Sequence, residues 1–241
     1  MYFKVSKKEF YNALSVASRA ISTFSPLPAF SGIKIDAKED CLILTGSDSD
    51  VSIQTKLTKS EECVLEIRDM GSIVIEAKYI LEIVRKIDAD EIEFEMIDGS
   101  LTKISGNTAE FRINGMRANE YPAIDFSKPK ECFALKEETL KKVILQTSFA
   151  TSDKETRPVL TGVNFHCEGN TLHCVATDSY RLAKKTIDIS ESLNFNITIP
   201  AKSLSEVVKT LEGEGEVEIA VNDKKAQFII HDTIVQTRLI D

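Results

Sequence analysis

Two short stretches of the sequence carry side chains that could bind a metal ion. Asp48-Ser49-Asp50 places two carboxylates close together, which is the chemistry of a metal-dependent nuclease. The pairs His166-Cys167 and His173-Cys174 lie on either side of the turn signal Gly169-Asn170, and imidazole and thiolate groups are common zinc ligands. The sequence therefore raises two hypotheses of metal chemistry, one catalytic and one structural.

Both hypotheses have simpler alternatives. Aspartate is common in turns because its carboxylate accepts hydrogen bonds from the backbone that follows it. Neighbouring residues of a strand face opposite sides of a sheet, so two His-Cys pairs do not easily converge on one ion, and cysteine is most often a small core residue. The sequence contains no GxxxxGK[ST] loop, GxSxG motif or HExxH motif. We therefore predict a protein that is not an enzyme and has no catalytic residues, metal ion or cofactor.

The composition narrows the class of protein further. The 241 residues carry a net charge of −8, so a globally basic nucleic-acid binder is excluded, although a locally basic surface is not. No apolar run approaches the roughly 18 residues of a membrane span, and the first ten residues lack a secretory signal. The five cysteines form no CxxC pair, which favours reduced thiols. We expect a cytoplasmic protein with no membrane association.

The chain contains an internal repeat at an offset of 130 residues. In this register Asp48-Ser49 aligns with Asp178-Ser179, and the counterpart of Asp50 is Tyr180, which argues against a site of paired carboxylates. The other identical or similar pairs are Phe10 and Leu140, Leu14 and Ile144, Ala20 and Ala150, Ser22 and Ser152, Pro28 and Pro158, Gly32 and Gly162, Ile33 and Val163, and Leu42 and Leu172. Because this register has no gap, we interpret it as the duplication of one unit.

The second part of each unit aligns at an offset of 124 residues. The matching pairs are Ile73 and Ile197, Ile75 and Ile199, Ala77 and Ala201, Lys78 and Lys202, Glu82 and Glu206, and Val84 and Val208. Because the offset falls from 130 to 124, the connection near residues 58–71 is six residues longer than its counterpart in the second unit, as expected of a loop. Residues 5–10 also resemble residues 75–80, so the basic module is a strand, a helix and several further strands.

Four segments have the apolar spacing of amphipathic helices, and most of the remainder is strand-like. The predicted helices are 6–20, with Ser6 as the N-cap and Glu9 at N3, and approximately 77–87, 137–147 and 201–211. The predicted strands include 41–45, 91–96, 109–113, 195–199, 216–221 and 226–230. Residues 120–129 lack periodicity and contain two prolines, as a linker does. We predict an α+β fold with domains at residues 1–125 and 126–241.

Three motifs resemble the bacterial sliding clamp, the beta subunit of DNA polymerase III. They are TDSYRL at Thr177–Leu182, RPVLTGV at Arg157–Val163 and NEYP at Asn119–Pro122. The resemblance implies the DNA-clamp fold, in which duplicated units each place two helices on one face of antiparallel sheets. It also implies a ring that encircles duplex DNA and tethers the replicative polymerase for processive replication. The family has three such units, so we expect this chain to be a truncated form that lacks the third domain.

Basic residues are concentrated on the predicted helices. Segments 6–20, 76–87, 136–148 and 201–211 carry net charges of +2, +1, +1 and +1 in a chain whose total is −8. The resemblance implies that these helices line the channel of the ring, where Lys and Arg attract phosphates without reading the base sequence. Ordinary solvated helix faces are the alternative. The residues expected to face DNA are Lys7, Lys8, Arg19, Lys78, Arg85, Lys141, Lys142, Lys154, Arg157, Lys202 and Lys209.

The loop that holds Lys154 and Arg157 has a counterpart in the first unit. That counterpart contains Phe24 and Leu27 and lacks basic residues. A DNA contact is therefore expected from the second-unit loop and not from the first.

The resemblance also implies two protein-binding surfaces. Short peptides of polymerase and clamp-loader subunits are expected to dock on an apolar wall and nearby polar groups, formed by Leu160, Thr177, Ser179, Tyr180, Arg181 and Leu182. Because the other wall belongs to the third domain, we expect weak peptide binding by this chain alone. A head-to-tail homodimer of the full-length protein is expected to use Ile83, Phe111 and Ile113, and ordinary core packing is the alternative for Ile83.

Two other functions remain as alternatives. One is a metal-dependent nuclease that uses Asp48, Asp50 and nearby acids. The other is a structural scaffold of β-repeats with no role on DNA. The clamp interpretation is preferred because one architecture explains both the duplication and the basic helices.

Overall fold

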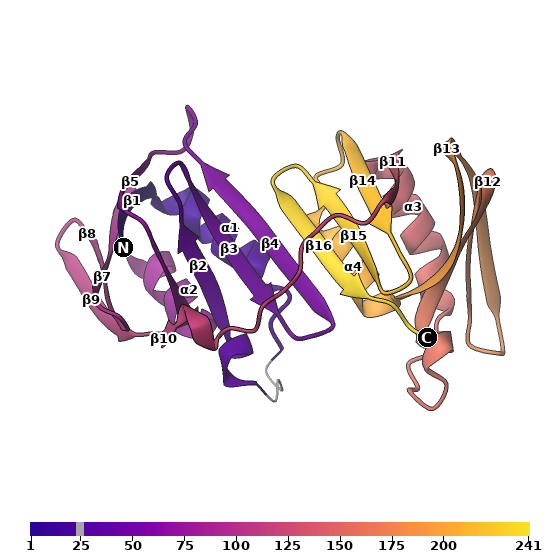
Figure 1. Ribbon diagram of the computed structural model, residues 1–241, viewed down its shortest axis with the longest axis horizontal. Coiled ribbons are helices and arrows are strands. Elements are labelled where there is room, and N and C mark those ends of the chain that lie inside the picture. Colours follow the sequence, from indigo (N-terminus) through magenta and orange to yellow (C-terminus); the bar gives the residue numbers. More distant parts are fainter. Residues whose placement is uncertain (23–26) are drawn as a thin grey trace. The chain divides into compact units, whose positions relative to one another are not determined.

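The computed structural model describes residues 1–22 and 27–241 of the chain. The chain divides into two compact units, Met1–Asp125 (unit 1) and Phe126–Asp241 (unit 2). Phe24, which was considered in the loop comparison, lies outside the described residues. Each unit combines two helices with antiparallel strands, which confirms the predicted α+β class (Figure 1).

The described residues of unit 1 form two antiparallel sheets. The first has the strand order β5-β1-β7-β8-β9, and the second contains β10-β6-β2-β3-β4. Its elements are β1 (Tyr2–Ser6), α1 (Lys7–Ser18), η1 (Pro28–Ser31), β2 (Gly32–Ala37), β3 (Cys41–Ser47), β4 (Val51–Thr58), β5 (Leu65–Asp69), β6 (Gly71–Glu76), α2 (Ala77–Lys86), β7 (Glu91–Asp98), β8 (Leu101–Gly106), β9 (Ala109–Asn114), β10 (Met116–Arg117) and η2 (Ala118–Glu120).

Unit 2 repeats this plan. One sheet contains β16-β15-β14-β11, and β12 pairs with β13 along most of its length. Its elements are β11 (Glu131–Lys136), α3 (Glu137–Thr147), η3 (Ser148–Ala150), η4 (Pro158–Thr161), β12 (Gly162–Thr177), β13 (Leu182–Pro200), α4 (Ala201–Thr210), β14 (Glu216–Val221), β15 (Lys225–Ile230) and β16 (Thr233–Arg238).

Strand β12 turns back on itself at Gly169. Gly169 has a φ of +61°, a conformation that glycine adopts without steric cost. The rings of His166 and His173 are 6.4 Å apart, whereas seven residues of a straight strand would separate them by about 23 Å. The two limbs of β12 therefore lie side by side, in agreement with the turn signal at Gly169-Asn170.

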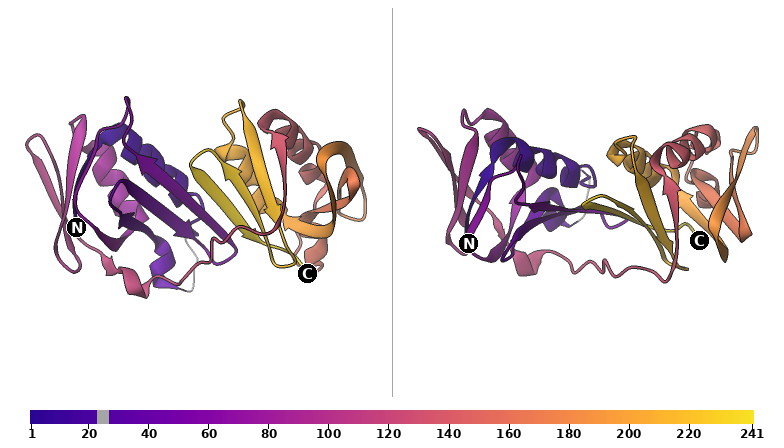
Figure 2. Two further views of the ribbon diagram at one scale, coloured as in Figure 1. Left: turned by 45° about the horizontal axis from the view of Figure 1, so that its top comes forward. Right: turned by 90° about the horizontal axis from the view of Figure 1, so that it is seen from above.

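The helices bury the faces that their apolar spacing predicts. In unit 1, Phe10, Leu14 and Ala17 of α1 are fully buried, and the Phe10 ring packs edge-on against Phe3 at 5.7 Å. Phe3 is in turn stacked on Phe94 of β7 at 4.7 Å. The two helices of each unit contact each other and pack on the strands (Figure 2). Each helix therefore has one face in the core and leaves the opposite face to solvent.

The first helix begins at the predicted N-cap residue, but the expected capping hydrogen bond is not made. Ser6 does occupy the N-cap position of α1, but its side chain caps no backbone group of the helix. Instead, the N–H of Val64 donates to Ser6 Oγ at 2.7 Å. Because Ser6 is also the last residue of β1, its hydroxyl faces the chain entering β5, and this tertiary contact replaces the local one.

The Asp-Ser turns confirm the duplication in atomic detail. Asp48 Oδ1 accepts hydrogen bonds from the N–H groups of Asp50 and Val51 at 3.1 and 2.8 Å. Asp178 Oδ1 accepts the corresponding bonds from the second and third residues after it, at 3.0 and 2.9 Å. Ser49 and Ser179 both have positive φ, +86° and +76°. Each aspartate thus stabilises a turn through its backbone neighbours, as the simpler alternative predicts.

Candidate nucleic-acid interface and partner surface

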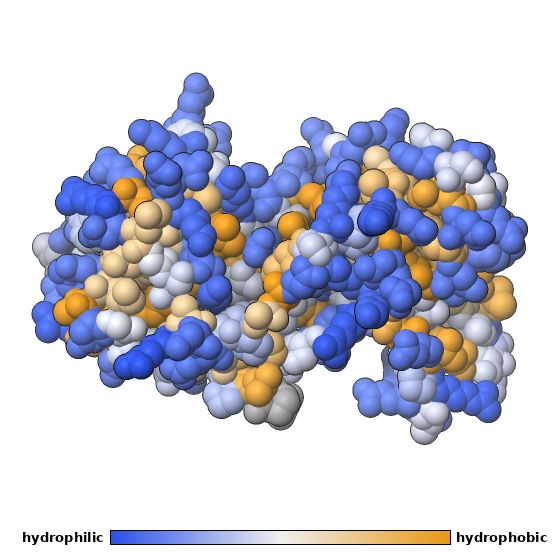
Figure 3. Space-filling model, viewed as in Figure 1, coloured by the Kyte–Doolittle hydropathy of each residue, from blue (hydrophilic) through white to orange (hydrophobic). Residues whose placement is uncertain are grey.

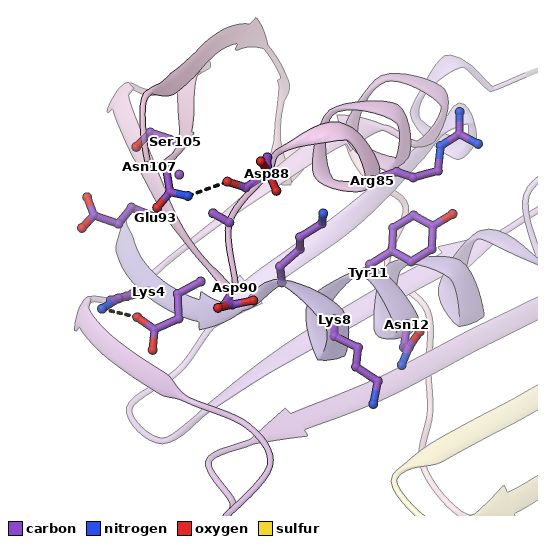
Figure 4. Close-up of a pocket in the computed structure, with 14 residues that line it drawn as sticks. Lys4, Lys8, Tyr11, Asn12, Arg85, Asp88, Asp90, Glu93, Ser105 and Asn107 are labelled. Atoms are coloured by element: carbon purple, nitrogen blue, oxygen red, sulfur yellow. Dashed lines mark hydrogen bonds and ion pairs between the residues drawn. The ribbon is translucent and has the colours of Figure 1, made fainter.

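Three of the unit 1 residues predicted to face DNA line a cleft between the start of α1 and the end of α2. Lys7 Nζ donates to the carbonyl oxygen of Ile87 at 2.5 Å, so the first turn of α1 satisfies a carbonyl at the C-terminus of α2. Lys8 and Arg85 line the same cleft, whose volume is about 900 Å³ (Figure 4). The ammonium of Lys7 is therefore used inside the unit.

Acidic groups balance part of the charge in this cleft. Lys4 forms an ion pair with Glu91, and the carboxylates of Asp88, Asp90 and Glu93 also line the walls. The Lys8 side chain is 85% exposed and lies 4.0 Å from the carboxylate of Glu9. In Figure 4, Lys8 extends away from the acidic wall. Lys8 therefore presents its charge to solvent and not to the acidic wall of the cleft.

The other predicted DNA contacts of unit 1 lie at the opposite ends of its helices. Arg19 is the C-cap residue of α1, and Lys78 is in the first turn of α2. Both side chains are exposed, and Lys78 Nζ lies 5.7 Å from the centre of the Tyr79 ring. Together with Lys8 and Arg85, they spread positive charge along both helices.

Unit 2 presents its basic residues in a similar way. The side chains on α3 and α4 are exposed, and two of them pair with acids one turn away: Lys142 with Glu138 at 2.6 Å and Lys209 with Glu206 at 2.8 Å. The Lys142–Glu138 pair is exposed on both sides and is therefore weak, whereas the side chain of Glu206 is only 15% exposed. The remaining predicted contacts, all exposed, are Lys141, Lys154, Arg157 and Lys202.

The turn before β13 is locked by its own polar side chains. The hydroxyl of Thr177 donates to the carbonyl oxygen of Arg181 at 2.7 Å and accepts the N–H of Ser179 at 3.1 Å. The backbone N–H groups of Arg181 and Tyr180 lower the pKa of Asp178, with a smaller contribution from the Arg181 guanidinium. The Thr177 hydroxyl is therefore used within the turn, whereas the sequence analysis expected it to contact a bound peptide.

This turn carries the most exposed large apolar side chains of unit 2. The exposed fractions are 98% for Tyr180 and 66% for Leu182, while Leu160 is half-buried. Sequence reasoning missed Phe149, which is 58% exposed on η3 and lies beneath the guanidinium of Arg181 at 5.5 Å. No pattern could have found it, because Phe149 follows the predicted helix and meets Arg181 only through the fold.

The three residues expected at a subunit interface differ from one another in how exposed they are. Phe111 is 38% exposed on β9, which is the last strand of its sheet in unit 1. Ile113 and Ile83 are half-buried and pack against the core of that unit. An edge strand leaves one row of backbone N–H and C=O groups without partners in its own sheet. Phe111 is the member of the set that is most available for contact.

In residues 1–22 and 27–241, no group of three or more His, Cys, Asp and Glu side chains is arranged to hold a metal ion. Within the same residues, no helix has the length and apolar character needed to cross a membrane.

Comparisons with known proteins identify the class and then the family. The solved structure of the DNA polymerase sliding clamp of Bacillus subtilis superimposes with a TM-score of 0.97 at 35% identity, over 100% of this chain and 65% of that one. The beta chain of DNA polymerase III from Streptococcus pneumoniae gives a TM-score of 0.95 at 31% identity, with the same coverage. The two units thus have the sliding-clamp fold.

The family assignment rests on sequence as well. Residues 1–125 match the N-terminal domain of the DNA polymerase III beta subunit, and residues 134–241 match its central domain. The beta sliding clamp of Halalkalibacterium halodurans is 38% identical over 248 residues. The chain therefore belongs to the DNA polymerase III beta subunit family. It spans about 65% of the length of the curated relatives that it matches.

Proposed function

We propose that this chain supplies two units of a ring that encircles duplex DNA and holds the replicative polymerase on it. The observation that carries the proposal is the placement of basic side chains. Of the eleven residues predicted to face DNA, ten are exposed and Lys7 alone is half-buried. Nine lie on α1 to α4 or directly at a helix end, and Lys154 and Arg157 lie in the loop between η3 and η4, in a chain with a net charge of −8. The proposal includes a cytoplasmic location, where the bacterial chromosome is replicated.

The physical basis of this function is weak attraction between basic side chains and DNA, combined with the closure of the ring. Lys and Arg side chains contact phosphates that are the same at every base pair, so the bound protein can slide. A closed ring cannot leave DNA sideways, and its retention therefore does not depend on tight binding. Negative charge elsewhere on the protein disfavours DNA on other faces. No bond is made or broken, so we propose a role without catalysis.

The alternatives are supported less well. A nuclease would need the carboxylates of Asp48 and Asp50 on one metal ion, but Asp48 Oδ1 is engaged by the N–H groups of its own turn. A scaffold without a role on DNA gives no reason for concentrating basic residues on the helices. In Figure 3, hydrophilic groups predominate on the visible face, with apolar groups interspersed among them.

Reversing charge on the helices tests the DNA contact. The quadruple variant Lys8→Glu, Lys78→Glu, Lys141→Glu, Lys202→Glu removes one exposed lysine from each helix. We expect its affinity for a short linear duplex at low salt to fall at least about tenfold. The slope of log K against log salt should become shallower by about 3.6, because each of the four lost phosphate contacts contributes about 0.9. Fluorescence anisotropy over a salt series measures both quantities.

A matched control distinguishes the effect of where the charges lie from the effect of the total charge. Lys38, Lys59, Lys130 and Lys224 are exposed lysines outside the helices, and converting them to Glu changes net charge equally. This control should retain most of the affinity. Equal losses in both variants, or no loss in the first, would contradict the assignment of DNA contact to the helices.

We further propose that peptides of polymerase and clamp-loader subunits bind at the turn before β13. The exposed apolar side chains of Tyr180 and Leu182, beside the guanidinium of Arg181, support this assignment. Because hydrogen bonds fix the backbone of this turn, little further conformational entropy is lost when a peptide binds to these side chains. We also propose that the edge strand β9, which carries Phe111, contacts another subunit in the full-length protein.

Phe149 is expected to position Arg181 for peptide binding. Phe149→Leu keeps an apolar side chain but removes the aromatic face, so peptide affinity should fall by about 2- to 5-fold, the equivalent of about 0.5–1 kcal/mol. Titration with a labelled polymerase-derived peptide measures the change. Met70→Leu, at a 64% exposed apolar position of unit 1, is the control and should have no effect. Unchanged affinity for the Phe149 variant would remove this residue from the site.

A further inference from the structure

We propose that His166 and His173 form a surface site for one divalent transition-metal ion, such as Ni²⁺, Zn²⁺ or Cu²⁺. The site lies on the solvent side of β12 in unit 2, away from the basic helices and the turn before β13. It differs from the sequence hypothesis of a zinc site with four ligands, because it uses the two imidazoles alone. It is also independent of the proposed function on DNA.

The turn at Gly169 brings the two imidazoles together. His166 and His173 lie on adjacent limbs of β12, with ring centres 6.4 Å apart and ring planes inclined by 58°. Two imidazoles that share an ion at nitrogen–metal distances of about 2.1 Å have ring centres about 5–6 Å apart. Small rotations about the side-chain bonds therefore suffice to bring one nitrogen of each ring onto a common ion.

Neighbouring groups favour a cation between these rings. His173 Nδ1 lies 2.9 Å from Thr186 Oγ1 on β13, a contact that orients the ring. When Nδ1–H donates to this hydroxyl, the lone pair of Nε2 is available to a metal, and such an outer partner is typical of metal-binding histidines. The carboxylate of Glu168 lies 3.6 Å from His166 Nε2 and adds negative charge beside the site.

The two cysteines next to these histidines are excluded from the site. Cys167 and Cys174 are both fully buried, so they face the core while the histidines face solvent. Their sulfur atoms therefore lie on the opposite face of the strand from an ion held between the two imidazoles. The alternation along the strand thus leaves two nitrogen ligands, with water completing the coordination of the ion.

Such a site would hold the two limbs of β12 together. An ion that binds the folded chain and not the unfolded one stabilises the fold by mass action. Among these ions, Cu²⁺ should bind most tightly, in keeping with the general order of divalent metals at nitrogen sites. Two ligands give weaker binding than the four of a structural zinc site, so we expect dissociation constants in the micromolar range.

Titration calorimetry with NiCl₂ and, separately, ZnCl₂ tests the proposal in a buffer that does not bind metals. The wild-type chain should bind one ion. His166→Gln and His173→Gln should each weaken binding at least about tenfold, because each removes one of two ligands. His231→Gln is the matched control, since it replaces the third histidine of the chain, and it should change the affinity less than about twofold.

A second measurement identifies the ligands directly. Electron paramagnetic resonance of the Cu²⁺ complex should resolve coupling to two imidazole nitrogens in the wild type and to one in either variant. Circular dichroism checks that the variants fold, which is expected because both side chains lie on the solvent side. The proposal is overturned if no saturable binding occurs at millimolar metal, or if His231→Gln weakens binding as much as His166→Gln and His173→Gln do.

Discussion

Replacing Glu137 by alanine is expected to destabilise unit 2 by about 3 kcal/mol. Glu137 begins α3 and is fully buried. Its Oε2 accepts the N–H groups of Glu212 and Gly213, both at 2.7 Å, and its Oε1 lies 3.1 Å from His231 Nε2. Removing the carboxylate leaves two backbone donors without an acceptor, and each such loss costs about 1–3 kcal/mol.

The carboxylate matters because it joins three segments. It ties the start of α3 to the loop between α4 and β14 and to the turn between β15 and β16. The N–H of Glu137 also donates to the carbonyl oxygen of Gly215 at 3.0 Å, which holds the same loop from the other side. A negative side chain at this position is further stabilised by the N-terminal end of the helix.

Denaturant unfolding and hydrogen exchange measure the effect of Glu137→Ala. The exchange of the loop at 211–215 should accelerate most, because its N–H groups lose their acceptor. Glu138→Ala is the matched control: Glu138 is the adjacent residue, is exposed, and pairs only with Lys142 among the contacts described. It should cost less than about 1 kcal/mol. Similar losses for the two variants would show that Glu137 does not join these segments.

The Gly46→Ala substitution is expected to destabilise unit 1 by about 2–3 kcal/mol. A Cβ atom at Gly46 would lie 2.1 Å from the carbonyl oxygen of Ala17 and 2.9 Å from its carbonyl carbon. These are backbone atoms of α1, so no side-chain rotation relieves the clash and the helix must move away from β3. Forcing extra atoms into a packed core typically costs about 1–3 kcal/mol.

The duplication supplies the control for this prediction. At the offset of 130 residues, the counterpart of Gly46 is Ala176, which is 2% exposed in β12. Unit 2 therefore already accommodates a methyl group where unit 1 has none. Ala176→Gly should cost only about 1 kcal/mol, mainly from backbone entropy. If Gly46→Ala proved as mild as this in thermal unfolding, the close approach of α1 to β3 would not be a constraint on unit 1.

The helices could be predicted because their signals are local. An apolar residue every three or four positions buries one face of a helix whatever it packs against, as Phe10 and Leu14 do in α1. The repeat could be read for a similar reason, since the same turn chemistry at Asp48 and Asp178 produces the same backbone. The basic residues expected to face DNA were predicted from these two signals together with the family motifs.

The contacts of individual polar side chains could not be predicted in this way. The Ser6 hydroxyl had a local partner available in the capping box, yet it accepts the N–H of Val64, 58 residues away. Lys7 belonged to the basic face of its helix, yet its ammonium binds the carbonyl of Ile87, 80 residues away. A hydrogen-bonding group takes the partner that the fold brings to it, and sequence spacing does not contain that information.

The sequence by itself determined the elements, their duplication and the family of this protein, because periodicity, turn residues and motifs are written along the chain. Only the tertiary structure decided that Phe149 lies beneath Arg181, that Glu137 joins three segments and that two histidines face each other on β12. Each of these depends on distances between residues far apart in sequence or across a turn. Such distances are set by packing, and packing is a property of the folded chain as a whole.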